Sequence, residues 1–416
     1  MAARCCPESL RRLVDVLIRN AEVEGRIIDL RLAGEQVEID AQRAAVLPGL
    51  VDHHIHVLAL GASLVSVDVS GGLDPLRAAP STSTGWIRAV GYPDDLDRWA
   101  IDAVVADHPI RVQHRSGSLW VLNSAALAAV GIDDHPDGRL FRRDDWLRDH
   151  IPSDVPDVVA VGRLLAGRGV TGLTDATPTN RIEDLQLLRT LPQRVMAMTA
   201  PGTPGDATVK LVVGDHELPS PEALVAAIEG ARPRRVALHC ATRVALLVTL
   251  AAFDLCGAEP GDRIEHGAVM SLDEAARVAA HGLVVVTQPS FVVERRHLYE
   301  REVEPYDLLD LWRCRSLIDV GVRVAGSTDA PYGSFDPWNA IAAASRRELG
   351  PAERVSATVA LNLFLTRLDD PAGAVRRVVS ERDLVVLDRP LADALADPAD
   401  VGIVATIING SIVRLL

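Results

Sequence analysis

The strongest constraint on the fold is an alternation of short apolar runs with helical segments, which repeats from about residue 158 onward. Each run is rich in β-branched residues and is followed by a segment rich in Ala, Leu and Arg. One such segment begins with Ser220, which can cap a helix, and Pro221, which suits the first helical position. Apolar strands that alternate with helices are typical of a parallel sheet with both faces covered. Seven runs follow the pattern: 169–176, 194–200, 208–213, 235–240, 262–267, 283–289 and 322–330.

An eighth run, AVLPGLVDHHIH at residues 45–56, lies upstream of the other seven. Eight strands are the number that closes a (β/α)8 barrel. The main alternative, a doubly wound open sheet, usually carries a glycine-rich phosphate-binding turn after its first strand, and this sequence has none there. We therefore predict an α/β fold built on a (β/α)8 TIM barrel.

Two parts of the chain interrupt this alternation. Residues 10–47 and 378–416 contain short strands and turns, including the hairpin signal Asn409-Gly410. They predict a small β-sandwich domain built from both chain ends, beside a barrel domain of residues 48–377. Residues 58–157 separate the first barrel strand from the second, and we expect this insertion to form a cap, because insertions at that face of a barrel usually shape the substrate pocket.

The composition restricts the class of protein. A chain of 416 residues with 48% hydrophobic content can bury a large core. A net charge of −14 without a cluster of Lys and Arg argues against a nucleic-acid partner. No uncharged apolar run reaches 18 residues, and the N-terminal segment lacks a signal-peptide core, so neither a membrane partner nor secretion is expected. The five cysteines show no CxxC spacing and are expected to be reduced thiols in a cytoplasmic protein.

Metal-ligating residue types follow the predicted barrel strands. In DHHIH the two-residue period of a strand places His54 and His56 on one face, while His53 points the other way. A single histidine at a strand end is more often structural, but the carboxyl ends of all barrel strands meet at one mouth. Imidazole and carboxylate donors together suit Zn²⁺ or a similar divalent ion. The candidate ligands are His54, His56, Lys210, His239, His266 and Asp329.

Lys210 is the single lysine among 43 basic residues, and it lies within the apolar run TVKLVV. Gradual replacement of lysine by arginine in a GC-rich genome could leave one lysine at any position. An unpaired ammonium inside this apolar run, however, would be costly to bury. A neutral lysine amine can add CO₂ to form a carbamate with two oxygens, whereas arginine stays protonated and cannot. Four histidines and one aspartate are more ligands than a single catalytic zinc ion commonly uses. They fit two ions about 3.5–4 Å apart, with a bridging hydroxide that attacks a polarised carbonyl. We therefore predict two divalent ions, Zn²⁺ by preference, bridged by carboxylated Lys210.

Several motifs resemble the amidohydrolase superfamily in content and in order. They are PGLVDHHIH, the lysine of the fourth strand, ALHC, RIEHG and GSTDAP. Within the superfamily the chain resembles the family-three amidohydrolases, the branch that includes the N-substituted formamide deformylases. The segments that carry this likeness are VDVSGG, TGWIRAVGY, GSLWVLNSAAL, GVTGLTDA, RIEHGAVMS, TQPSF and GSTDAPYG.

The resemblance implies a hydrolase that acts on carbon–nitrogen bonds other than peptide bonds, such as an amide, formamide or cyclic amide of a small molecule. It also implies that Asp329 takes a proton from the bridging water and passes it to the leaving amine. One ion would be held by His54, His56, Lys210 and Asp329. The other would be held by Lys210, His239 and His266. Candidate substrate contacts are Arg115, Trp120 and Gln288.

Two other functions stay open from the residues alone. A mononuclear deaminase of the same superfamily needs no strand-4 lysine and typically carries a glutamate shortly after the strand-5 histidine. Here His239 is followed by Cys-Ala-Thr-Arg, so that glutamate is missing. A non-catalytic barrel that binds a ligand is the second alternative, although all six ligand positions are filled. The sequence also leaves a homo-oligomer open.

Overall fold

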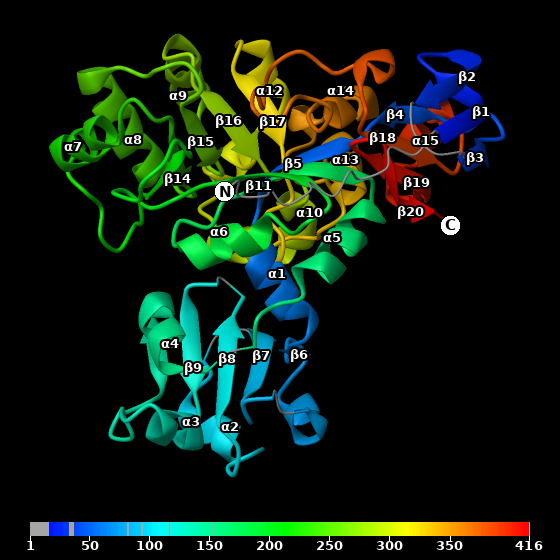
Figure 1. The fold of residues 1–416 in the computed structure, drawn as a ribbon. Coiled ribbons are helices and arrows are strands. Elements are labelled where there is room, and N and C mark those ends of the chain that lie inside the picture. The colour runs from blue at the N-terminus through cyan, green and yellow to red at the C-terminus, as the bar shows by residue number, and fades with distance from the viewer. Residues whose placement is uncertain are drawn as a thin grey trace, which may run out of the picture. The chain divides into compact units, whose positions relative to one another are not determined.

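The structure, a computed structural model, describes residues 16–32, 37–80, 83–92, 95–115, 117–152 and 154–415 (Figure 1). Residues 10–15, 33–36 and 416 of the predicted small β domain lie outside the described residues, as do residues 81–82, 93–94, 116 and 153 of the predicted cap. The chain divides into two compact units. Unit 1 comprises residues 1–55, 162–328 and 334–416, and unit 2 comprises residues 56–161 and 329–333.

Each of the eight predicted runs contains a strand of unit 1. The strands form one sheet in the order β12-β11-β5 and another in the order β13-β14-β15-β16-β17, and all their pairings are parallel. Most of their side chains are buried, as expected for parallel strands covered on both faces, except in β12, where Arg194 is exposed and the other three residues are half-buried. The bounds are β5 (Leu50–Ile55), β11 (Val170–Asp175), β12 (Arg194–Ala197), β13 (Val209–Val212), β14 (Val236–Cys240), β15 (Arg263–His266), β16 (Val284–Thr287) and β17 (Arg323–Gly326).

Specific contacts link the outer strands of the two parallel sheets. A parallel bridge joins Thr199, just beyond β12, to Val209 of β13. At the other side, the backbone N–H of Thr328, just beyond β17, donates to Asp52 Oδ1 of β5 at 3.1 Å, and the Thr328 hydroxyl donates to the same carboxylate. The fold is therefore α/β, with eight parallel strands in chain order in the described part of unit 1.

Helices follow most of these strands, and their ends obey local rules. Ser220 accepts a hydrogen bond from the Ala223 N–H at 3.2 Å and Pro221 occupies the first position of its helix, which confirms the predicted start. In another helix Ser271 and Glu274 form a reciprocal capping box. The bounds are α5 (Val158–Ala166), α6 (Ile182–Leu188), α7 (Pro221–Ala231), α8 (Arg243–Cys256), α9 (Leu272–Ala280), α10 (Phe291–Glu294), α11 (Arg296–Glu302), α12 (Arg315–Asp319), α13 (Pro337–Arg346), α14 (Ala357–Asn362) and α15 (Leu391–Ala396).

Strands from both chain ends share one apolar cluster, in which Val16 and Ile18 pack with Leu384 and Ile407. The hairpin between the last two strands turns at Asn409-Gly410, where both residues have positive φ, as the sequence predicts. The first sheet has the order β2-β1-β3 and the second the order β20-β19-β18-β4. The bounds are β1 (Val16–Val23), β2 (Arg26–Leu32), β3 (Val37–Asp40), β4 (Val46–Pro48), β18 (Leu384–Leu387), β19 (Ile403–Ile408) and β20 (Ser411–Leu415).

Unit 2 is built on a sheet of order β10-β9-β8-β7-β6. One face is apolar and buries Ile87, Ala89, Ile110 and Val112. The strands are β6 (Val67–Asp68), β7 (Ile87–Tyr92), β8 (Ile110–His114), β9 (Leu119–Leu122) and β10 (Arg139–Phe141). The helices are α1 (Val57–Leu64), α2 (Arg98–Asp102), α3 (Ser124–Ala129) and α4 (Asp144–His150). In the described parts of both units, no helix combines the length and apolar character that crossing a membrane requires.

The packing at the end of β17 yields a stability prediction. A Cβ added at Gly326 would lie 2.5 Å from the ring of Phe364, a core residue that is 1% exposed. Gly326→Ala should therefore lower the free energy of unfolding by about 1–3 kcal/mol, because the ring must move within a packed core. Gly230→Ala is the matched control, since a Cβ there, in α7, meets nothing within 4 Å. The control should raise stability by up to about 1 kcal/mol. Equal urea midpoints for the two variants would contradict the packing described here.

Candidate metal centre

His54, in β5, is held by a buried carboxylate. Its Nδ1 donates a hydrogen bond to Glu265 of β15, and both side chains are fully buried. Glu265 also accepts a hydrogen bond from Arg263 Nε. Burial raises the pKa of Glu265, but the charges of Arg263 and Lys210 outweigh this effect and leave the pKa below its usual value. Because Nδ1 is occupied as a donor, His54 can offer the lone pair of Nε2 to a ligand.

Lys210 lies beside that nitrogen. Its Nζ is 3.4 Å from His54 Nε2, and the residue is 3% exposed, so the lysine is buried rather than at the surface. Lys210 occupies the second position of β13, between the strands that carry His54 and His239 in chain order. The structure thus places the single lysine of the chain next to the first predicted histidine ligand.

His239 and His266 form a second close pair. His239 Nδ1 lies 3.0 Å from His266 Nε2, and the rings of His266 and His54 have centroids 4.8 Å apart. His266 Nδ1 lies 2.9 Å from Gln288 Oε1, which fixes the ring orientation. Burial, followed by the charges of His239, His54 and Lys210, lowers the pKa of His266 well below its usual value. The neutral imidazole, the form that binds metals, is therefore favoured at His266.

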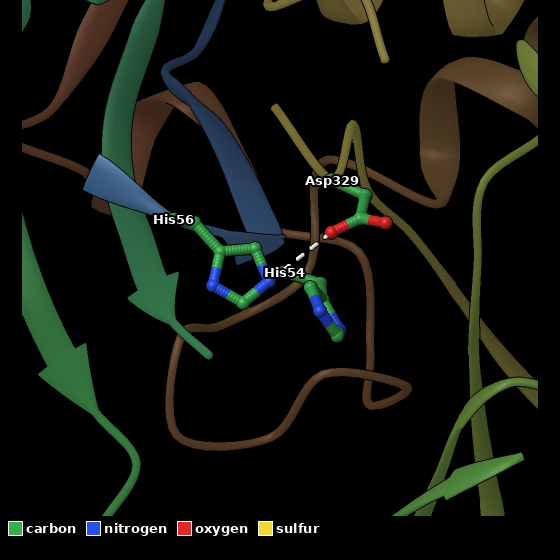
Figure 2. Close-up of side chains that lie close together, drawn as sticks. All are labelled: His54, His56 and Asp329. Atoms are coloured by element: carbon green, nitrogen blue, oxygen red, sulfur yellow. Dashed lines mark ion pairs between the residues drawn. The ribbon is translucent and has the colours of Figure 1, made fainter. Parts of the chain in front are cut away.

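His56 and Asp329 meet just beyond β5 and β17. His56 Nε2 lies 3.3 Å from Asp329 Oδ1, and the His56 N–H donates to the Ala330 carbonyl at 2.9 Å. Figure 2 shows His56 and Asp329 joined by this ion pair, with His54 close to both. Ligand atoms of His54, His56 and Asp329 all lie within 4.8 Å of one another, so these three residues form a candidate metal site.

Two of the predicted ligands have an unusual backbone. His266 has a φ of 71° and Asp329 a φ of 55°, the left-handed region that favours glycine. Side chains held in this region are strained, and such residues cluster at functional sites. The turn at His266 also breaks the strand alternation, so both Glu265 and His266, which are neighbours in sequence, contact the His54 ring. A regular strand would place them on opposite faces.

The structure also locates the predicted substrate contacts. The side-chain amide of Gln288 is fully buried, between His266 Nδ1 and Ser327 Oγ, to which it donates at 2.8 Å. The Trp120 indole N–H, in unit 2, donates to Asp144 at 2.8 Å. Arg115 follows β8 in the same unit. Roles in substrate binding stay predictions for all three.

The sequence analysis missed Glu265 and did not assign a role to Asp52. Both carboxylates are fully buried in the strands that carry His266 and His54. A charged residue inside an apolar strand run needs a buried partner, so the Glu of RIEHG was a usable signal. His53 does point away from the site, as predicted, and its Nε2 lies 2.9 Å from the Thr366 hydroxyl.

Comparison with known proteins identifies the family. The model of the Amidohydrolase family matches residues 37–149 and 194–414, which is more than half of the chain. The chain belongs to the amidohydrolase family. As a member it is a hydrolase that acts on carbon–nitrogen bonds other than peptide bonds, which confirms the predicted family and enzyme class.

Individual relatives are distant but cover most of this family member. An N-substituted formamide deformylase of Arthrobacter pascens is 24% identical over 89% of each chain. The putative amidohydrolase YtcJ of Bacillus subtilis is 24% identical over 91% of this chain and 90% of its own. A metal-dependent hydrolase of Pyrococcus horikoshii has a TM-score of 0.68 at 18% identity, covering 93% of this chain and 98% of its own. N-isopropylammelide isopropylaminohydrolase of Burkholderia multivorans has a TM-score of 0.56 at 16% identity, with coverage of 97% and 100%.

The contacts of Glu265 predict a large effect on stability. Glu265→Gln keeps the size of the side chain but removes the charge that faces Arg263, whose side chain is 7% exposed. The variant should lose about 3 kcal/mol or more in the free energy of unfolding, because a guanidinium is left buried without its anion. Glu183→Gln, at an exposed position in α6, is the control and should stay within about 0.5 kcal/mol of the parent. Similar urea curves for the two variants would contradict the assigned ion pair.

Proposed function

We propose that this amidohydrolase hydrolyses the amide, formamide or cyclic amide bond of a small molecule with two divalent ions, Zn²⁺ by preference. The observation that carries the proposal is the convergence of the predicted ligands at the strand ends. Within unit 1, His54 lies next to Lys210 and His266, and His266 lies next to His239. His56 and Asp329 complete the group around His54.

The donor set fits divalent ions. Nitrogen donors and one carboxylate suit zinc and related first-row ions. The hydrogen bonds on the far side of two rings fit as well. The Glu265 carboxylate holds His54 and the Gln288 amide holds His266, in the way that metal-binding histidines are usually oriented. In the proposed centre His54, His56, Lys210 and Asp329 would hold one ion. Lys210, His239 and His266 would hold the other.

Lys210 is proposed to act as a carbamate. The neutral amine attacks CO₂, a carbon–nitrogen bond forms, and one amine proton is released to solvent. The product carries a negative charge and two oxygens, which would be available to the ions. An ammonium 3.4 Å from a ligand nitrogen of His54 would instead repel a cation bound there. The burial of Lys210, with its Nζ beside His54 Nε2, supports its place in the proposed centre.

When bound, the two ions would activate a water molecule and polarise the scissile carbonyl. Asp329 would accept a proton from the attacking water and then donate it to the amine nitrogen as the carbon–nitrogen bond breaks. His56, 3.3 Å from Asp329 Oδ1, orients this carboxylate. Substrate contacts are assigned to Arg115, Trp120 and Gln288 as part of the same proposal.

We also propose that the eight parallel strands close into a (β/α)8 barrel. The bridge between Thr199 and Val209 and the bonds between Thr328 and Asp52 support closure, since they lie where the two sheets must join. In the same proposal, residues 10–47 and 378–416 form a small β-sandwich domain beside the barrel domain of residues 48–377, with residues 58–157 as a cap. The cytoplasmic location remains a prediction.

Metal content separates this function from a mononuclear deaminase. The purified, metal-loaded enzyme should contain about two ions per chain by elemental analysis, and chelation should abolish turnover of a panel of formamides, amides and cyclic amides. Readdition of Zn²⁺ should restore it. One ion per chain in the fully active enzyme would favour the deaminase, and a metal-loaded protein that turns over none of the panel would favour a binding protein.

The carbamate can be tested by chemical rescue. Lys210→Ala should lose at least about a hundredfold in kcat/KM, because the shared ligand of both ions is gone. Added propionate, which supplies two oxygens within the vacated space, should restore part of the activity and of the metal content, whereas propionamide should restore neither. Growth of a carbamate carbon signal in NMR spectra with ¹³C-bicarbonate should accompany activity in the parent. Full metal content and activity in Lys210→Arg would overturn the bridge, because arginine cannot form a carbamate.

A further inference from the structure

Two arginines lie side by side on the second face of the unit 2 sheet. Strands β7 and β8 are parallel neighbours (Figure 1). Their register places Arg88 directly opposite Arg111. The residues that flank them along the strands, Ile87, Ala89, Ile110 and Val112, point into the apolar core on the other face. Like charges placed directly opposite each other on adjacent strands are destabilising, so the pair needs a compensating interaction.

The protein supplies little compensation for these charges. Arg88 donates to the Ser66 hydroxyl and, at 2.8 Å, to the Gln113 amide oxygen, which are both neutral acceptors. Arg111 Nε is buried and has no hydrogen-bond partner. No carboxylate of the described residues forms an ion pair with either arginine. Burial, with a further contribution from Arg111, lowers the pKa of Arg88 to about 10, and burial also lowers the pKa of Arg111.

Trp120 forms the floor beneath both guanidinium groups. The Cζ atoms of Arg88 and Arg111 lie 5.2 Å and 5.4 Å from the centre of the indole ring. This cation–π contact stabilises the charges in part and holds the two groups over one surface. Both terminal nitrogens of Arg88 already donate to Ser66 and Gln113, whereas Arg111 Nε has no partner, so Arg111 offers the free donor to a planar acceptor.

Both arginines line a cavity of about 430 Å³ that is formed entirely by residues 61–161. Its other walls are mainly apolar and include Leu64, Trp86 and Val161. Asp154 and Asp157 also reach this cavity, but their carboxylates accept hydrogen bonds from Ser83 and from the Ala160 N–H. The volume falls within the range of small-molecule sites, which are typically apolar with a few polar groups that fix orientation.

We propose that this cavity binds a small organic carboxylate, whose anionic group pairs with Arg111 and Arg88 and whose compact apolar body packs against the cavity walls. The carboxylate neutralises two opposed cations at once, and the fork of Arg111 can bind it through two parallel hydrogen bonds. The apolar walls favour an organic acid over a free inorganic anion, which would leave them unfilled. The proposal does not require the metal ions or the reaction assigned to them, although it shares Trp120 with the proposed substrate contacts.

Benzoate is a suitable probe, and benzamide is its neutral match in shape. Calorimetric titration of the full-length, metal-loaded enzyme should show one benzoate site per chain and at least about tenfold weaker binding of benzamide. Benzoate should also raise the melting temperature in a saturable way. Equal binding of the two probes would overturn the proposal. So would inorganic phosphate binding as tightly as benzoate, because the apolar walls would then contribute nothing.

Variants test the location of the site. Arg111→Gln should weaken benzoate binding at least about tenfold, while Arg77→Gln, which removes an exposed arginine of the same unit, should leave it unchanged. Without benzoate, Arg111→Gln should melt at the same or a higher temperature, because the repulsion from Arg88 is gone. An unchanged benzoate affinity in Arg111→Gln would place the carboxylate elsewhere, such as at the metal ions, and would overturn the proposal. If Arg111→Gln fails to fold, Arg111→Lys, which keeps the charge but lacks the fork, should still weaken binding.

Discussion

The buried carboxylate of Glu265 connects the two parallel sheets of unit 1 to the chemistry of the site. It accepts from His54 Nδ1 on β5 and from Arg263 Nε on its own strand, and Arg263 in turn donates to the His53 carbonyl at 2.8 Å. These bonds join β15, in the middle of one sheet, to β5, at the edge of the other. A charge in this position would be costly without its partners, so the interaction also specifies how the two sheets pack.

The same interaction determines what His54 can do. With Nδ1 committed to Glu265, the ring presents Nε2 to Lys210, and the left-handed turn at His266 brings a second imidazole toward the same place. Strained backbone at His266 and at Asp329 has a stability cost that the surrounding packing must offset. We interpret this strain as the cost of directing several donors from separate strands at one point, which regular strand geometry does not allow.

Among the described residues, the buried arginine pair of unit 2 lacks the carboxylate partner that Arg263 has in unit 1. In unit 1 the buried Arg263 faces the carboxylate of Glu265, whereas in unit 2 Arg88 and Arg111 face each other over an indole ring. A polar group that the fold leaves uncompensated often marks a place where a ligand completes the interaction. The contrast between these two pairs supports a ligand-binding role for Arg88 and Arg111 and a structural role for Glu265.

Much of the fold followed from the sequence because strand and helix periods are local properties. The eight apolar runs, the start of α7 at Ser220 and the turn at Asn409-Gly410 all depend on neighbouring residues, and the structure contains each of them. The candidate ligands could also be named from sequence, since the carboxyl ends of parallel strands meet on one side of a sheet. The metal roles of these residues remain to be tested.

Only the tertiary structure decided which distant residues became partners. The role of Glu265 could not be deduced from the two-residue period of a strand. The left-handed backbone at His266 interrupts this alternation, so Glu265 and His266 both face His54. The engagement of Gln288 with His266 and the pairing of Arg88 with Arg111 depend on strand register, which is set by packing between segments far apart in the chain. The sequence by itself thus determined the elements and the types of donor, whereas the orientation and compensation of each charge arose from long-range contacts that no local pattern encodes.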